Sequence, residues 1–188
     1  MSGQAMLFVG GVRSGKSALA QRWAEACAPR RLYVATAVAE DAEMAARIAR
    51  HRAERGTGWQ CLEAPVDPAN AIRKHLADTA EALPGVVLFD CVSLWIANEL
   101  ALGLAEKSIL ERLAALMTLM AGHGLPFGLV SLEAGLGMVP LSASGRAFQD
   151  VLGLSNQMLA RVCTSVIFVS CGLPMALKGT IPEEICKC

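Results

Sequence analysis

The 188-residue chain has 17 basic and 17 acidic side chains, 54% hydrophobic residues and 5% aromatic residues. A net charge of zero does not indicate a nucleic-acid or anionic-membrane partner, and so few aromatic residues argue against a base-stacking surface. No segment is long and apolar enough to span a bilayer, and the N-terminus lacks the regions of a signal peptide, so we expect a cytoplasmic protein. The length favours a single domain over residues 1–188, with a tail at 179–188 for which no structure is predicted.

Short apolar runs alternate with amphipathic stretches along the chain. Strands are expected at 5–9, 32–35, 59–63, 86–90, 127–132 and 166–170, and helices at 17–27, 41–55, 67–83, 94–102, 106–123 and 144–164. This alternation predicts an α/β fold with a mostly parallel sheet flanked by helices. Ligands of such sheets gather at the carboxyl ends of the strands. Residues 135–145 are rich in glycine, proline and serine, which is typical of a loop.

A complete phosphate-loop pattern, G-x-x-x-x-G-K-S, follows the first apolar run directly. It consists of Gly10, Gly11, Val12, Arg13, Ser14, Gly15, Lys16 and Ser17. Glycines let the backbone curl around phosphate oxygens, and the loop N–H groups and the positive helix end face the anion. Lys16 would reach the β- and γ-phosphates, and the Ser17 hydroxyl would ligate Mg²⁺. A glycine turn that merely fits the pattern is the alternative.

Polar residues end three of the predicted strands. Asp90 stands where phosphate-loop enzymes hold Mg²⁺, directly or through water, although it could instead cap the next helix. Glu133 follows another strand and is either a second metal or base carboxylate or an anchor for the loop after it. Thr36 could approach the nucleotide or act only as a cap.

A basic segment near residue 50 is the other informative stretch. On a helix, Arg47, His51 and Arg55 are spaced i, i+4 and i+8 and share a face. An imidazole flanked by guanidiniums suits phosphate binding, and such a histidine can attack phosphorus covalently. From spacing alone, a solvated basic face is the favoured interpretation. The residues by themselves therefore predict an Mg²⁺-dependent α/β enzyme of nucleotide phosphates and leave the acceptor open.

The chain resembles the bifunctional adenosylcobinamide kinase / adenosylcobinamide-phosphate guanylyltransferase family from the phosphate loop to about Lys178. Eight pieces match in family order: 10–17; Tyr33-Val34-Ala35-Thr36-Ala37; 41–48 leading to His51-Arg52; Trp59 with Glu63; 90–95 with Asn98; 133–140; 146–150 with Gly153 and Asn156-Gln157; and 169–170 with 172–174 and 177–178.

The resemblance implies two reactions in cobalamin biosynthesis. The first phosphorylates the aminopropanol hydroxyl of adenosylcobinamide with ATP or GTP. The second transfers GMP from GTP to that phosphate, which gives adenosylcobinamide-GDP and pyrophosphate. It also implies a RecA-like phosphate-loop fold and a homotrimer, with a corrinoid and GTP or ATP as the small-molecule partners.

The resemblance also assigns site residues, and it reverses the interpretation of the basic segment. His51 becomes the nucleophile that carries GMP, and Lys16 is the other catalytic residue. Ala35, Thr36, Ala37, Arg52, Arg55, Glu63 and Asp90 join the phosphate loop as nucleotide-binding residues. Arg47, Arg52 and Arg55 could neutralise charge at the attacked phosphorus, and Glu63 could accept hydrogen bonds from the guanine edge.

The chain departs from the family pattern in three places. Leu132 stands where the family usually has asparagine, Ala134 follows Glu133, and Gly56-Thr57-Gly58 replaces a region where proline is common. The loss of an amide at Leu132 bears on the contacts with the second substrate. Apolar contacts with the corrinoid could come from Trp95, Met138 or the 135–145 loop.

Two other functions compete with the bifunctional enzyme. A plain phosphate-loop kinase of small molecules would need no histidine nucleophile. A nucleotide-dependent switch or scaffold would bind GTP with Mg²⁺ and turn over no corrinoid. The phosphate loop alone does not separate these functions, whereas the order of the matching pieces favours the bifunctional enzyme.

Overall fold

The computed structural model describes residues 4–39, 41–79 and 83–186. In chain order the elements are β1 (Ala5–Gly10), α1 (Lys16–Cys27), β2 (Arg31–Ala35), α2 (Ala42–Glu54), β3 (Trp59–Glu63), α3 (Pro68–Asp78), β4 (Val86–Asp90), α4 (Val92–Ala101), α5 (Glu106–His123), β5 (Phe127–Leu132), α6 (Ala143–Val162), β6 (Ser165–Ser170), β7 (Leu173–Lys178) and α7 (Glu183–Cys186). Within the described part of the chain, none of the helices combines the length and the apolar character that crossing a membrane would require.

The strands form one seven-stranded sheet in the order β3-β2-β4-β5-β1-β6-β7. All neighbouring pairs are parallel except β6 and β7, which run antiparallel at the edge. The predicted α/β fold with a mostly parallel sheet is therefore confirmed.

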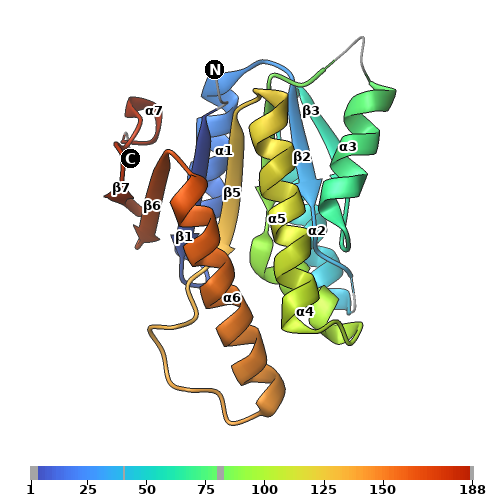
Figure 1. Cartoon of the computed structure of the whole chain (residues 1–188). Coiled ribbons are helices and arrows are strands. Elements are labelled where there is room, and N and C mark those ends of the chain that lie inside the picture. The colour runs from blue at the N-terminus through green and yellow to red at the C-terminus, as the bar shows by residue number, and fades with distance from the viewer. Residues whose placement is uncertain (1–3, 40, 80–82, 187–188) are drawn as a thin grey trace.

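Helices cover both faces of the sheet, and the residues of β1 alternate between the two layers. Leu7 and Val9 pack in the layer that contains α3, α4, α5 and α6, whereas Met6 and Phe8 pack with α1 (Figure 1). All of β1 is buried, as expected for a central parallel strand that is covered on both sides. The strand before the phosphate loop is thus a buried strand in the interior of the sheet.

The β7 strand was not predicted from the sequence. Cys171 and Gly172 both have positive φ, 53° and 79°, and form the tight turn that reverses the chain after β6. Such a turn matches the twist of a hairpin but usually carries Asn-Gly or Asp-Gly, so Cys-Gly gave a weak signal. Beyond β7 the tail continues into α7, which packs on α1 with Ile185 fully buried.

The structure also moves some predicted helix ends. Helix α3 ends at Asp78 and not at Leu83. Both the amide and the hydroxyl of its C-cap, Thr79, donate to the carbonyl of His75. Residues 80–82 of that predicted helix lie outside the described residues. Helix α4 begins at Val92, with Cys91 rather than Asp90 as its N-cap. The side chain of Asp90 is therefore not used as a helix cap.

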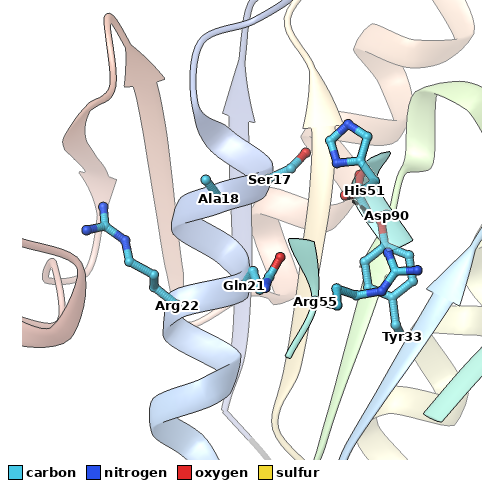
Figure 2. A pocket seen from close by; sticks show the side chains of 8 residues that line it. All are labelled: Ser17, Ala18, Gln21, Arg22, Tyr33, His51, Arg55 and Asp90. Atoms are coloured by element: carbon cyan, nitrogen blue, oxygen red, sulfur yellow. Dashed lines mark hydrogen bonds between the residues drawn. The ribbon is translucent and has the colours of Figure 1, made fainter. Parts of the chain in front are cut away.

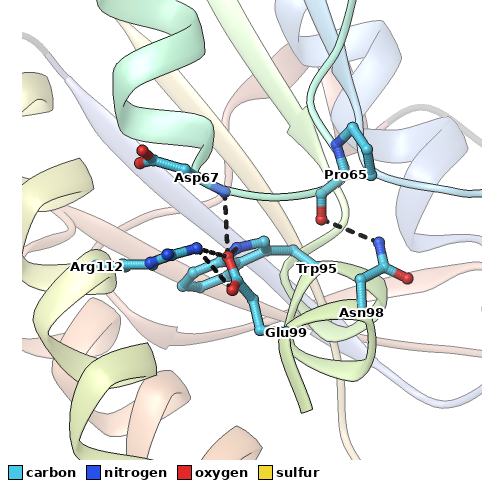
Figure 3. Close-up of polar contacts among 6 residues, drawn as sticks. All are labelled: Pro65, Asp67, Trp95, Asn98, Glu99 and Arg112. Atoms are coloured by element: carbon cyan, nitrogen blue, oxygen red, sulfur yellow. Dashed lines mark hydrogen bonds and ion pairs between the residues drawn. The ribbon is translucent and has the colours of Figure 1, made fainter. Parts of the chain in front are cut away.

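A buried carboxylate joins three helices on the face away from α1. Glu99 of α4 is fully buried, and its Oε1 accepts hydrogen bonds from Trp95 Nε1 at 2.8 Å and from the Asp67 amide at 3.1 Å. Arg112 of α5 donates to both oxygens of Glu99, at 2.8 and 2.7 Å (Figure 3). Every oxygen of this buried charge is therefore matched by a donor, as burial of a carboxylate requires.

We expect Arg112→Ala to lower the free energy of unfolding by about 3 kcal/mol, because it leaves Glu99 buried without its cation. Denaturant unfolding measures the change. Lys107→Ala is the matched control, since Lys107 and Glu111 form an ion pair 3.9 Å long with side chains 88% and 66% exposed. It should change stability by less than about 0.5 kcal/mol. Equal losses in the two variants would contradict a special role for the Glu99 network.

Candidate nucleotide and transfer site

The phosphate loop leaves β1 and enters α1 with a backbone that requires its glycines. A Cβ on Gly10 would collide with the carbonyl oxygen of Val169 and lie 2.7 Å from Ser14 Oγ. Gly15, the N-cap of α1, has φ of 92°, a conformation that side chains disfavour. Ser14 Oγ is buried and has no hydrogen-bond partner within the described residues. The loop therefore has the tight curvature and the inward-facing polar group of an anion cradle.

Lys16 and Ser17 open α1 at the rim of a large cavity. The Lys16 ammonium lies over the loop and donates to the Gly11 carbonyl at 3.0 Å. Arg13, within the loop, has φ of 57°. The predicted helix start at Ser17 lies one residue inside the observed helix. Lys16, the predicted phosphate ligand, and Ser17, the predicted Mg²⁺ ligand, are both in its first turn.

The main cavity, of about 620 Å³, lies between the phosphate loop, α2 and the carboxyl ends of β2, β3 and β4. It brings together residues that are far apart in the sequence. Its predicted site residues are Val12, Lys16, Ser17, Ala35, Ala37, His51, Arg52, Arg55, Glu63 and Asp90. Val38, Met44, Ile48, Leu94 and Leu132 are among its apolar lining residues. The cavity therefore has the polar and apolar walls that a nucleotide requires.

His51 reaches the cavity from α2, which begins at an N-cap where Asp41 Oδ1 accepts from the Met44 amide at 2.7 Å. None of the helix residues whose burial is described is fully buried. Arg52 pairs with Glu63 at 2.9 Å, and both of these side chains are exposed. The side chain of Arg47, the third member of the predicted basic face, lies outside the described residues.

Arg55 ends α2 in an extended conformation and lies on the ring of Tyr33, with its guanidinium carbon 3.8 Å from the ring centroid. The Tyr33 hydroxyl donates to Asp90 Oδ2 at 2.9 Å. Burial, followed by the negative charge of Asp90, raises the pKa of Tyr33 far above its ordinary value. Tyr33 is therefore a permanent donor that fixes one oxygen of Asp90 and supports the end of the histidine helix. Sequence reasoning assigned Tyr33 no role.

Thr36 supports the site from inside the sheet and does not line the cavity. It is fully buried, and its hydroxyl donates to the Cys91 carbonyl and accepts from the Cys91 amide, both at 2.8 Å. Asn98 donates to the carbonyls of Thr36 at 2.8 Å and Pro65 at 3.0 Å. Burial and the neighbouring Asp90 raise the pKa of the Cys91 thiol to about 11. These bonds hold the ends of β2, β3 and β4 together beneath Asp90.

Glu133 lies outside the lining of the main cavity and anchors the loop that follows it. Its Oε1 accepts from the amides of Gly135 and Leu136, the latter at 3.1 Å. Leu132, the residue before Glu133, does line the cavity. Within the described residues, no group of three or more His, Cys, Asp or Glu side chains could hold a metal ion. The geometry supports the loop-anchor interpretation of Glu133.

The structure also separates the candidate contacts for a large apolar substrate. Trp95 is fully buried and bonded to Glu99, so it is not available to a ligand. Met138 is 93% exposed in the loop between β5 and α6. Of the residues predicted to make apolar contacts with the corrinoid, Met138 and its loop are therefore the ones that remain available to a ligand.

A second, smaller hollow of about 290 Å³ adjoins the main cavity on the side of α1. We call it the side hollow; it is lined by Ser17, Ala18, Gln21, Arg22, Tyr33, His51, Arg55 and Asp90 (Figure 2). Five of these residues also line the main cavity, namely Ser17, Tyr33, His51, Arg55 and Asp90. The two spaces therefore meet at the proposed nucleophile and the strand-end carboxylate.

The family profile and the curated relatives that match this chain indicate the same family. The profile of the family described as cobinamide kinase / cobinamide phosphate guanyltransferase matches residues 6–177. The chain is 42% identical over 173 residues to the bifunctional adenosylcobalamin biosynthesis protein CobP of Pseudomonas aeruginosa, covering 92% of this chain and 96% of that protein. It is 33% identical over 191 residues to the bifunctional adenosylcobalamin biosynthesis protein CobU of Salmonella typhimurium, covering 92% and 99%.

Among solved structures, a KaiC-like protein from Pyrococcus horikoshii is similar, with a TM-score of 0.51 and 18% identity. The likeness covers 89% of this chain and 71% of that one. At this identity it bears on the fold alone.

Proposed function

The chain belongs to the cobinamide kinase / cobinamide phosphate guanyltransferase family, and we propose that it carries out both reactions through the main cavity. The curated relatives are named as bifunctional proteins of adenosylcobalamin biosynthesis, and they match over nearly their full length. One observation carries the proposal: a single cavity contains both the phosphate-loop residues Lys16 and Ser17 and the histidine His51.

A nucleoside triphosphate would lie with its β- and γ-phosphates on the phosphate loop, where the loop amides and Lys16 face the anion. Ser17 and Asp90 fit a Mg²⁺ ion, because both present oxygen to the same cavity and hard cations prefer oxygen ligands. When bound, Mg²⁺ would neutralise charge on the phosphate oxygens. Tyr33 fixes Asp90 Oδ2 by its hydrogen bond and leaves the other oxygen of Asp90 for this role.

In the kinase reaction, the hydroxyl oxygen of adenosylcobinamide attacks the γ-phosphorus of ATP or GTP. The bond from the γ-phosphorus to the bridging oxygen breaks, the nucleoside diphosphate leaves, and the hydroxyl proton passes to solvent. Lys16 and the loop amides stabilise the charge that builds on the leaving diphosphate. Catalysis in this reaction depends mainly on position and charge, which the rigid β1–α1 connection supplies.

In the guanylyltransferase reaction, a ring nitrogen of His51 attacks the α-phosphorus of GTP. A nitrogen–phosphorus bond forms, the bond to the bridging oxygen breaks, and pyrophosphate leaves toward the phosphate loop. Arg52 and Arg55 line the same cavity and would balance charge on the attacked phosphorus. The phosphate of the acceptor then displaces His51 and receives the GMP group.

Glu63 would choose guanine over adenine by accepting hydrogen bonds from the N–H groups on the guanine edge. Its Oε1 already accepts from Arg52, and this pair is exposed and therefore weak. Guanine can thus bind the second oxygen of Glu63 or replace Arg52 at small cost. Val38 and Ile48, which line the same cavity, offer apolar surface for a purine ring.

Intact-mass analysis after incubation with GTP and Mg²⁺ should show a gain of one GMP, at neutral to alkaline pH because phosphoramidates are acid-labile. His51→Asn should abolish the gain, since it removes the nucleophile. His123→Asn is the matched control, because His123 is exposed at the end of α5, and it should retain the gain. Phosphorylation of cobinamide without any adduct, with GTP binding confirmed, would instead support a plain kinase.

Glu63→Gln should reduce the preference for GTP over ATP about 10- to 100-fold in adduct formation. Both oxygens of a carboxylate can accept hydrogen bonds from guanine N–H groups, whereas an amide has only one accepting oxygen. The ratio of kcat/KM values for the two nucleotides measures this effect. Glu43→Gln, at an exposed position in the first turn of α2, should leave the ratio unchanged. An unchanged ratio in Glu63→Gln would remove Glu63 from base recognition.

We also propose that the chain assembles as a homotrimer. The edge strand β7 carries Leu173, Met175 and Leu177 with 58, 59 and 62% of their surface exposed. An apolar row on an edge strand is a surface that proteins usually cover.

Light scattering should therefore give a mass three times that of the 19.8 kDa chain. Met175→Lys should lower this mass by placing a charge in the apolar row. Leu102→Lys, at an exposed leucine after α4, should leave the mass unchanged. A monomeric mass for the unmodified chain would contradict the trimer.

A further inference from the structure

The side hollow is lined by two polar side chains that no step of the proposed function uses, Gln21 and Arg22. Ser17 and Gln21 are one turn apart on α1 and face His51, Arg55 and Asp90 across the hollow (Figure 2). Gln21 is half-buried, and its amide donates to Glu25 at 3.0 Å, which is an interaction along its own helix. The hollow is therefore a site with polar groups on both walls, next to the nucleotide cavity.

The direction of attack in the second reaction places the acceptor on this side. Displacement at phosphorus brings the entering oxygen opposite to the leaving atom. Once GMP is bonded to His51, the leaving atom is the ring nitrogen, so the acceptor oxygen must approach from the wall that faces His51. That wall of the hollow is the surface of α1 that carries Ser17 and Gln21 (Figure 2).

The first reaction places the same end of the acceptor in the same space. The hydroxyl must reach the γ-phosphate, which lies near Lys16, Ser17 and Asp90 in the proposed function. Ser17 and Asp90 line the hollow as well as the main cavity. An acceptor held in the hollow would therefore meet the γ-phosphate in the first reaction and His51 in the second, with only a small shift.

Charge and size agree with this placement. Two arginines, Arg22 and Arg55, line the hollow against one carboxylate, Asp90. Together with His51 and the neutral amide of Gln21, this lining suits a phosphate monoester. A volume of about 290 Å³ accepts a short phosphorylated chain but not a corrin macrocycle. The macrocycle would then remain outside the hollow, and only the aminopropanol arm would enter.

We propose that the side hollow is the acceptor subsite, where Gln21 contacts the hydroxyl of cobinamide in the first reaction and its phosphate in the second. In the second reaction an oxygen of that phosphate forms a bond to the phosphorus carried by His51. The nitrogen–phosphorus bond breaks, its electron pair returns to the ring, and His51 keeps its other N–H proton and leaves as neutral imidazole. This assignment rests on the proposed guanylyl transfer.

The test is Gln21→Glu in the full chain, with two measurements. GMP loading of His51 from GTP should stay within about 2-fold of the unmodified chain, because Gln21 takes no part in that step. The KM for cobinamide phosphate should rise about 10-fold or more, because a carboxylate repels the acceptor phosphate. The KM for unphosphorylated cobinamide in the kinase reaction should rise much less, since its hydroxyl is neutral.

Gln4→Glu is the matched control, because Gln4 is exposed just before β1, at the opposite end of that strand from the phosphate loop. It makes the same change of charge and should leave all three measurements unchanged. Gln21→Leu, which adds no charge, should raise the KM for both acceptors and leave GMP loading intact.

Normal GMP loading together with an unchanged KM for cobinamide phosphate in Gln21→Glu would overturn the acceptor subsite while leaving the proposed function in place. Absence of GMP loading in the unmodified chain would overturn the proposed function and the subsite with it. Loss of loading in Gln21→Glu, with an unchanged melting temperature, would assign Gln21 to the nucleotide and also overturn the subsite.

Discussion

The pairing of parallel strands is the constraint on which the rest of the site depends. Ala35 at the end of β2 lies in register with Glu63 of β3 on one side and Asp90 of β4 on the other. Gly10, where the phosphate loop begins, is paired with Leu132 of β5 and Val169 of β6. Backbone hydrogen bonds between the strands thus place the phosphate loop and the two carboxylates at the carboxyl ends of the strands.

Side-chain hydrogen bonds also hold the carboxyl ends of β2, β3 and β4 together. Thr36 bonds both backbone groups of Cys91, and Asn98 joins the ends of β2 and β3. Behind them, Glu99 links α4 to α5 and to the start of α3. Thr36, Asn98 and Glu99 do not themselves line the main cavity. They hold in place the strand ends whose residues line the cavity, and such support gives a binding site a fixed geometry.

The histidine helix is held in a different way from the sheet. Its described residues are at most half-buried. Two contacts hold its C-terminal end: the exposed pair of Arg52 with Glu63 and the stack of Arg55 on Tyr33. The proposed phosphate site is therefore built on the buried sheet, while the proposed nucleophile His51 lies on a less buried helix. Tyr33 connects the two, since it contacts Arg55 with its ring and Asp90 with its hydroxyl.

The sequence by itself determined the phosphate loop, most strand positions and the α/β class, because these depend on local spacing and on alternation of apolar residues. The order of the family motifs also predicted roles for His51 and Glu63, which both line the main cavity and whose roles remain predictions. Only the tertiary structure decided that Glu133 caps its own loop, that Thr36 points into the sheet and that Trp95 is buried. The Tyr33–Asp90 bond joins positions 57 residues apart, and the side hollow brings Gln21 opposite His51. Such contacts depend on strand order and on which face each helix presents, and neither can be read from the local pattern of one chain.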